Sequence, residues 1–274
     1  MRNPFVASTI ARMFLRPGGS SVPDDEYFPF IRLPNGTFKT TRANRLTDVD
    51  ARLIALLSRE ARHYDLLDVA ASSGTCTVEL DAALRAHGIE HATFASDLIL
   101  DACCLSLWPA RILFCEQDHL LQVDLAGLAF PNTPPSRLSG LLFFVARGLI
   151  GLARRVGWSA AQVPLLSVAA RRSTVKFSEG DVFGEVFRAD PARRFDVIRA
   201  ANILTASYFT EAEIKRAIAN LKSRLRPEGL LVLVRTENEV NLTSVFRLHH
   251  DSLELVEHVN GGVEIAAWVA EASD

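Results

Sequence analysis

Small residues follow the first apolar run of this chain, in a pattern that suits a ligand-binding turn. Asp68 lies near the end of the run 65–71, and Ala70, Ser72 and Gly74 follow at alternate positions. Side chains this small let backbone N–H groups approach a ligand where the next helix begins. The turn is therefore a candidate binding site.

Further candidate residues follow the later apolar runs, and three of them are polar. The further candidates, in chain order, are Asp97, Leu98, Asp181, Val182 and Asn202. The Asp97 carboxylate is suited to accept two hydrogen bonds from the hydroxyls of a ribose. Open parallel sheets bind ligands outside the carboxyl ends of their strands, so we expect all these residues to gather at one edge of a sheet.

The elements that would position these residues alternate between short strands and amphipathic helices. We predict strands at 65–71, 92–97, 175–183 with its loop, 195–200 and 230–236, and helices at 47–62, 75–87 and 210–225. Thr47 is the expected N-cap of the first helix, and Thr210 with Glu213 forms a capping box. Apolar strands alternating with helices predict an α/β fold whose parallel sheet is covered on both faces.

The C-terminal part differs from this alternation. The segments 244–248, 253–259 and 265–269 are strand-like, and Asn260, Gly261 and Gly262 make a tight connection between the last two. This pattern predicts a C-terminal antiparallel hairpin at one edge of the sheet.

From about Thr47 onward the chain resembles the class I S-adenosylmethionine-dependent methyltransferases. Asp68, Ala70, Ser72 and Gly74 match the family's first motif, an acidic residue with alternating glycines, although only the last glycine is kept. The stretch 225–230 is similar to the family's L-x-P-G-G-x turn, with Glu228 in place of the first glycine. The resemblance implies a Rossmann-like sheet of seven strands and S-adenosylmethionine as cofactor.

The resemblance also implies a role for each candidate residue. Asp97 would bind the ribose hydroxyls, and Asp181 would bind the adenine amino group, with Val182 against the ring. Asp68, Ala70 and Asn202 would line the amino acid end. The rival for the same residues, a nicotinamide-binding Rossmann domain, predicts a G-x-G-x-x-G turn that this chain lacks. An α/β domain without any ligand is the remaining structural interpretation.

The implied reaction is methyl transfer to a small-molecule or lipid-like acceptor. One alternative is a protein methyltransferase, acting on a carboxyl or another side chain and distantly like the chemotaxis receptor enzymes, through Asn202 and Tyr208-Phe209. Another is a non-catalytic, cofactor-binding regulatory protein of the same fold. The Asn or Asp, Pro-Pro and aromatic pattern of nucleobase methyltransferases is missing after 195–200, so no nucleic acid partner is expected.

No catalytic residue is assigned from the sequence. A general base is useful where the acceptor is a hydroxyl or a protonated amine, and the candidates near strand ends are His63, His249, His250, Tyr208 and Glu237. The four cysteines include no C-x-x-C pair, so we expect neither a metal site nor a disulfide framework. Reduced thiols and the lack of a continuous N-terminal apolar run indicate a cytoplasmic protein.

The chain is divided into an irregular lead-in at 1–45 and a methyltransferase domain at 46–274, with 98–173 as a long, lid-like insertion. Within it, 138–156 has a helical apolar stripe of Leu138, Leu141, Leu142, Val145, Leu149, Leu152 and Val156. From 125 to 178 there is no acidic residue and a local charge of +7, against a net charge of −2 for the chain. The internal Arg147 disfavours a membrane span, which leaves a scaffold helix, a lid over an apolar substrate, or a peripheral membrane contact through 138–155. The oligomeric state stays open.

Overall fold

The computed structural model describes residues 28, 31–116, 119–126, 128–131 and 137–271. The chain divides into two compact units. We call residues 1–42 and 99–168 the insertion unit, and residues 43–98 and 169–274 the main unit. Most of the predicted lead-in 1–45 lies outside the described residues.

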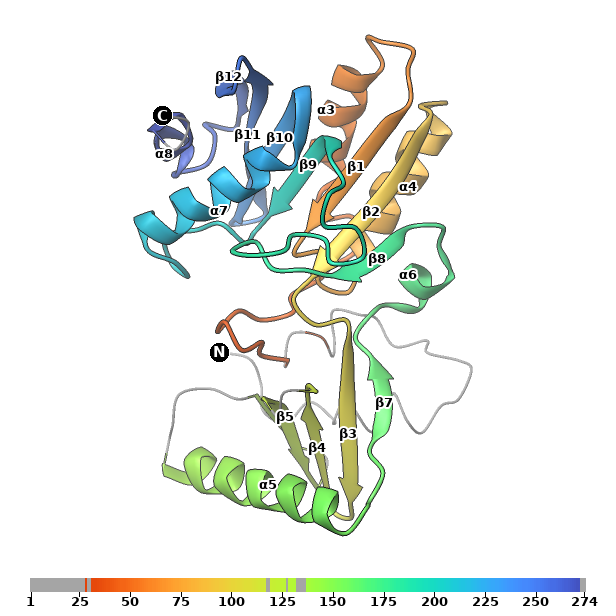
Figure 1. Cartoon of the computed structure of the whole chain (residues 1–274), viewed down its shortest axis with the longest axis vertical. Helices are drawn as coiled ribbons and strands as arrows, with labels where there is room; N and C mark the ends of the chain where they lie inside the picture. The colour runs from red at the N-terminus through yellow and green to blue at the C-terminus, as the bar shows by residue number, and fades with distance from the viewer. Residues whose placement is uncertain (1–27, 29–30, 117–118, 127, 132–136, 272–274) are drawn as a thin grey trace. The chain divides into compact units, whose positions relative to one another are not determined.

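The main unit contains a seven-stranded sheet with the order β12-β11-β10-β9-β1-β2-β8 (Figure 1). Its strands are β1 (Tyr64–Val69), β2 (His91–Asp97), β8 (Lys176–Glu179), β9 (Phe195–Ala201), β10 (Leu225–Glu237), β11 (Val240–His249) and β12 (Ser252–Val259). The first five of these run parallel, and β11 and β12 add an antiparallel hairpin at the β10 edge. The predicted α/β fold with a seven-stranded, Rossmann-like sheet is confirmed.

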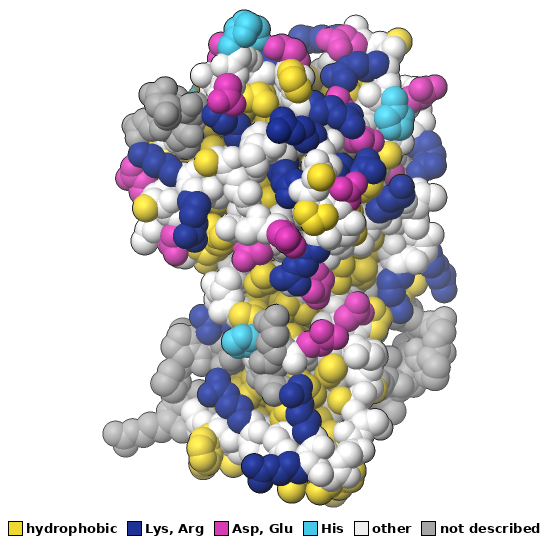
Figure 2. Space-filling model, viewed as in Figure 1, with side chains coloured by type: hydrophobic (Ala, Val, Ile, Leu, Met, Phe, Trp, Pro, Cys, Tyr) yellow, Lys and Arg dark blue, Asp and Glu magenta, His cyan; other side chains and the backbone are white. Residues whose placement is uncertain are grey.

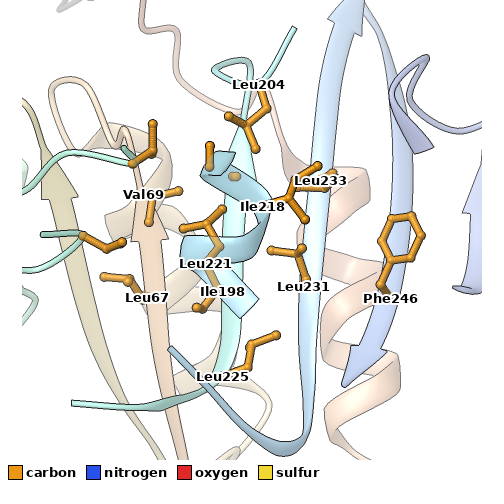
Figure 3. Close-up of a cluster of buried hydrophobic side chains, with 14 of the residues drawn as sticks. Leu67, Val69, Ile198, Leu204, Ile218, Leu221, Leu225, Leu231, Leu233 and Phe246 are labelled. Carbon is orange, nitrogen blue, oxygen red and sulfur yellow. The ribbon is translucent and has the colours of Figure 1, made fainter. Parts of the chain in front are cut away.

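Alternate residues of the central strands enter two separate cores, one on each face of the sheet. Leu66 and Val197 pack with helices α3 (Thr47–Leu57) and α4 (Thr75–Ala86). Leu67 and Ile198 pack instead with α7 (Glu211–Ser223) and α8 (Ala266–Glu271), and Figure 3 shows Ile218 and Leu221 of α7 among them. Because side chains alternate along a strand, this two-sided burial explains the nearly continuous apolar runs.

Helix ends follow the expected chemistry at α7 and depart from it at α3. The Thr210 side chain accepts a hydrogen bond from the Glu213 N–H, and the Glu213 carboxylate accepts from the Thr210 N–H, so the capping box is confirmed. The expected Thr47 cap is wrong, because α3 has Leu46 at its cap position and no side-chain cap. Asp50, in the first turn of α3, points into the protein and pairs with Arg199.

The C-terminal hairpin lies in the sheet, but its limits differ from the prediction. It turns at His250 and Asp251, which both have positive φ as a two-residue hairpin connection requires. The predicted turn at 260–262 instead leads out of the sheet, and the expected strand 265–269 overlaps α8. Ile265 and Val269 are both buried while Ala267 between them is exposed, which fits a helix, because a strand would place all three on one face.

The insertion unit is a five-stranded sheet with the order β6-β5-β4-β3-β7, antiparallel throughout. Its strands are β3 (Asp101–Leu107), β4 (Ala110–Phe114), β5 (Leu120–Leu125), β6 (Leu128–Pro131) and β7 (Ala161–Pro164). Strands β4 and β5 pair with each other, and residues 117 and 118 between them lie outside the described residues. A short helix, α6 (Val168–Arg172), follows β7.

Helix α5 (Arg137–Arg155) covers this sheet with a different face from the expected one. Phe143, Ala146, Ile150 and Ala153 are buried in the core of the unit. Leu142 and Leu149 are partly buried, and the rest of the described predicted stripe, Leu141, Val145, Leu152 and Val156, is exposed. None of the helices in the described part of the chain has the length and apolar character that a membrane crossing needs.

Candidate functional site

The candidate residues follow four neighbouring parallel strands and lie along one edge of the main sheet. Strand register aligns Val69 with Ser96 and with Ala200, and it aligns Asp97 with Glu179. The carboxyl ends of β1, β2, β8 and β9 therefore meet at this edge, as the sequence predicts.

The turn after β1 adopts an alternating backbone conformation. Ala70, Ser72 and Gly74 have φ values of +55°, +58° and +80°. These are the positions where the resembled motif has glycines, and glycine adopts positive φ without steric cost. A Cβ atom at Gly74 would lie 2.6 Å from the Phe177 ring and 2.8 Å from the Ala170 Cβ. The last glycine is therefore required by space as well as by φ, whereas Ala70 and Ser72 occupy the left-handed region at some strain.

Asp97 connects this turn to the end of β2. Its carboxylate oxygen Oδ2 accepts a 2.7 Å hydrogen bond from the Ser72 N–H, and its backbone oxygen accepts one of 2.9 Å from the Gly180 N–H. The Asp97 side chain is buried at the edge, and Leu98 beside it is half-buried. A carboxylate has about four acceptor positions. A carboxylate at this position is the kind of acceptor that ribose hydroxyls require.

Asp68 is held by a buried cation that the sequence analysis did not identify. Arg199 of β9 is 1% exposed, and its guanidinium donates to both Asp68 carboxylate oxygens, at 2.9 and 2.7 Å. The Thr77 hydroxyl donates to the same carboxylate at 2.5 Å. The Asp68 carboxylate thus fastens β1 to β9 and to the first turn of α4. The resemblance placed it at the amino acid end of the cofactor, and there its backbone is better suited to contact a ligand than its carboxylate.

Arg199 also binds Asp50 at 2.5 Å, which completes a buried group of one guanidinium and two carboxylates. Burial raises the pKa of Asp50 to about 6, although the nearby Arg199 charge opposes this shift. Burial by itself lowers the pKa of Arg199. The negative charges of Asp68 and Asp50 outweigh this effect, so the pKa of Arg199 lies above its usual value. A charged residue within the apolar run 195–200 was the signal for this network, because a buried arginine requires anionic partners.

The loops after β8 and β9 meet through aromatic side chains. The Phe183 and Phe209 rings lie 4.9 Å apart, edge to face. Asp181 accepts a 2.9 Å hydrogen bond from the Phe183 N–H through its carboxylate, so it shapes this loop directly. Val182 is buried in the core below it, and its backbone oxygen accepts from the Asn220 side chain. Asp181 and Val182 therefore lie at the predicted edge, on a loop that is held from both sides.

Asn202 fastens the end of β9 to β10. Its side-chain oxygen accepts from the Thr236 N–H at 2.7 Å, and its amide group donates to the Thr236 hydroxyl at 3.1 Å. Asn202 has a φ of +59°, which turns the chain sharply out of the sheet. The half-buried Asn202 thus lies at the site edge, directly after β9.

The candidate bases divide between the two ends of the sheet. His63 precedes β1, His249 ends β11 beside Glu228, and His250 follows it, so all three lie at the edge opposite the site. Tyr208 and Glu237 lie on the site side, after β9 and at the end of β10. Within the described residues, no group of His, Cys, Asp and Glu side chains is arranged to hold a metal ion.

No protein-family model and no curated protein matches the sequence. Solved structures with a similar arrangement include the N-methyltransferase NodS from Bradyrhizobium japonicum WM9 in complex with S-adenosylhomocysteine. It is 16% identical over 70% of this chain and 62% of that one, with a TM-score of 0.34. CalS10, an amino pentose methyltransferase from Micromonospora echinaspora, is 16% identical over 76% of this chain and 63% of that one, with a TM-score of 0.34.

The CMeT domain of the citrinin polyketide synthase is 15% identical, over 84% of this chain and 43% of that one, with a TM-score of 0.39. This chain spans less than two thirds of the length of each of these three proteins. At this identity and TM-score the comparisons decide nothing about function.

Proposed function

We propose that the protein is an S-adenosylmethionine-dependent methyltransferase acting on a small-molecule or lipid-like acceptor. One observation carries the proposal. The turn 70–74, with positive φ at three alternate residues, is hydrogen-bonded through Ser72 to a buried Asp97 at the end of the neighbouring strand. This combination presents backbone groups and a carboxylate side by side, as an adenosine ligand with a charged amino acid end requires.

Bound S-adenosylmethionine would supply an electrophilic methyl group on its sulfonium sulfur. The chain's own contribution is to orient the ribose through Asp97, to line the amino acid end with the turn 70–74, and to hold the adenine beside Asp181 and Val182. Alignment of the acceptor and exclusion of water can account for much of the rate of such an in-line displacement. Where the acceptor must lose a proton, Tyr208 and Glu237 are the candidates on the correct edge.

Calorimetric titration of the protein with S-adenosylmethionine and S-adenosylhomocysteine tests the cofactor. Binding of both ligands supports the proposal, and binding of neither rejects it. Incubation of a cell extract with the protein and methyl-labelled cofactor then identifies the acceptor class. Label in the lipid or small-molecule fraction is expected, whereas label in protein would favour the protein methyltransferase alternative. Binding without any transfer would favour a regulatory protein.

The Asp97→Asn variant tests the ribose assignment. The amide oxygen still accepts from the Ser72 N–H, so the turn should persist, but the charge that strengthens two hydroxyl contacts is lost. Hydrogen bonds to a charged group contribute about 1.5 to 3 kcal/mol each. We expect S-adenosylhomocysteine affinity to fall at least about tenfold, with little change for the exposed control Asp101→Asn. Wild-type affinity in Asp97→Asn would refute the assignment.

The interpretation of the segment 98–173 as a lid-like insertion stays part of this proposal. A lipid-like acceptor would be met at a membrane surface. The element that we assign to such a contact is α5.

A further inference from the structure

The outward face of α5 is unusually apolar for an exposed helix. Leu141 is 62% exposed, Phe144 76% and Leu152 51%. Val145 and Val156 lie on the same side at helical spacing and are also exposed. Isolated exposed apolar side chains are ordinary, but five along one helix face form a contiguous patch of the kind that marks an interaction surface.

The charged residues of α5 itself are all arginines. Arg147, Arg154 and Arg155 of α5 are exposed, and no acidic residue occurs between 125 and 178. Figure 2 shows the basic side chains and the yellow apolar ones together on the part of the surface where α5 lies in Figure 1. The patch therefore complements a partner that is apolar and anionic at once. A second copy of the same face would bring arginines against arginines, which opposes self-association.

We infer that α5 docks on the surface of an anionic lipid bilayer, with its outward apolar face between the headgroups. A helix that lies in a membrane interface combines an apolar face with flanking basic residues in this way. Trp158, which follows the helix end, is 55% exposed, and tryptophan favours the boundary between headgroups and acyl chains. The buried face of α5 remains on its sheet, so docking requires no unfolding of the insertion unit. The inference is independent of methyl transfer.

Co-sedimentation of the full-length protein with vesicles tests the docking. The vesicles contain phosphatidylcholine alone or phosphatidylcholine with phosphatidylglycerol. We expect sedimentation that requires phosphatidylglycerol and weakens as salt is raised. Each arginine near an anionic surface contributes about a fivefold change in partitioning, so Arg147→Gln with Arg155→Gln should weaken binding about 25-fold. Leu152→Ser should weaken binding about tenfold, through lost apolar burial.

Matched controls lie on the main unit. Arg194→Gln removes an exposed charge, and Leu255→Ser changes a leucine of similar exposure, 49% against 51%. Both controls should bind vesicles as the wild type does. Equal sedimentation with both vesicle types, or wild-type binding by the α5 variants, would overturn the inference. A dimer of the wild type in light scattering that Leu152→Ser converts to a monomer would also overturn it, because the face would then bind a second copy. Circular dichroism confirms that each variant remains folded.

Discussion

The turn 70–74 keeps the backbone of a glycine motif although two of its glycines are replaced. Ala70 and Ser72 have positive φ, which costs a residue with a Cβ about 1 to 2 kcal/mol. Ala70→Gly should therefore raise the free energy of unfolding by about 1 kcal/mol, since relief of strain exceeds the extra entropy of the unfolded chain. Urea denaturation measures this change. Ala71→Gly is the control, because Ala71 has no positive φ and glycine there should lower stability.

The single positive charge of Arg199 can neutralise only one of its two carboxylate partners, Asp50 and Asp68. Burial raises the folded-state pKa of Asp50 from 3.8 to about 6, so the Asp50 carboxyl binds a proton more readily in the native protein than in the unfolded chain. The stability contributed by Asp50 is therefore fully present below the unfolded pKa and is lost as the pH rises through about 6. We expect the free energy of unfolding of the wild type, relative to Asp50→Asn, to fall by about 2 kcal/mol between about pH 4 and about pH 7.

Urea denaturation of both proteins across this pH range measures the difference. Asp251→Asn serves as the control, because the Asp251 side chain is 89% exposed and should show no comparable trend. A difference between wild type and Asp50→Asn that stays constant with pH would contradict a raised pKa.

Among the elements, α5 buries a different face from the one that the apolar stripe of its sequence predicts. Residues 141–145 are all apolar, so the helix has two apolar faces and the pattern could not say which one the sheet would cover. The structure buries Ile150 and exposes Leu152. Ile150→Ala should cost about 2 to 5 kcal/mol through cavity formation, and Leu152→Ala should change stability by less than about 0.5 kcal/mol. Thermal and urea unfolding compare the two, and equal losses would contradict the observed packing.

Elements were predictable where local chemistry and burial agreed. The Thr210 and Glu213 pair and the two-sided apolar strands fixed α7 and the parallel sheet from sequence. Strand β3 was not expected, because its burial depends on β4 and β7, which pair with it only after the chain has turned back. The hairpin turn at His250 and Asp251 was missed for a related reason. Gly261 and Gly262 form a stronger local turn signal, while the actual turn contains two residues that adopt positive φ without glycine.

Much of the candidate site was also predictable, because parallel strands bring their carboxyl ends to one edge whatever the side chains between them. The contact of Ser72 with Asp97 follows from that geometry. Arg199 was missed because its partners, Asp50 and Asp68, come from other elements, so no sequence spacing marks the network. The separation of His249 from the site likewise depends on β11 running antiparallel, which places its end at the opposite edge.

At the scale of the whole molecule, each unit has its own hydrophobic core. Clusters around Leu67 and Leu66 belong to the main unit, and the cluster around Ile112 belongs to the insertion unit. Separate cores predict two unfolding transitions, because the loss of one core need not expose the other.

The cofactor should distinguish these transitions, since every candidate contact lies in the main unit. Trp268 of α8 reports on that unit once Trp108 and Trp158 of the insertion unit are replaced by phenylalanine. S-adenosylhomocysteine at about 100 times its dissociation constant should stabilise the Trp268 transition by about 2.7 kcal/mol. Ile150→Ala should leave the Trp268 transition at the same denaturant concentration. It should shift only the second transition, that of the insertion unit, which far-ultraviolet circular dichroism also records. If Ile150→Ala moves the Trp268 transition equally, the two units unfold as one and a ligand of the main unit must stabilise the insertion unit as well.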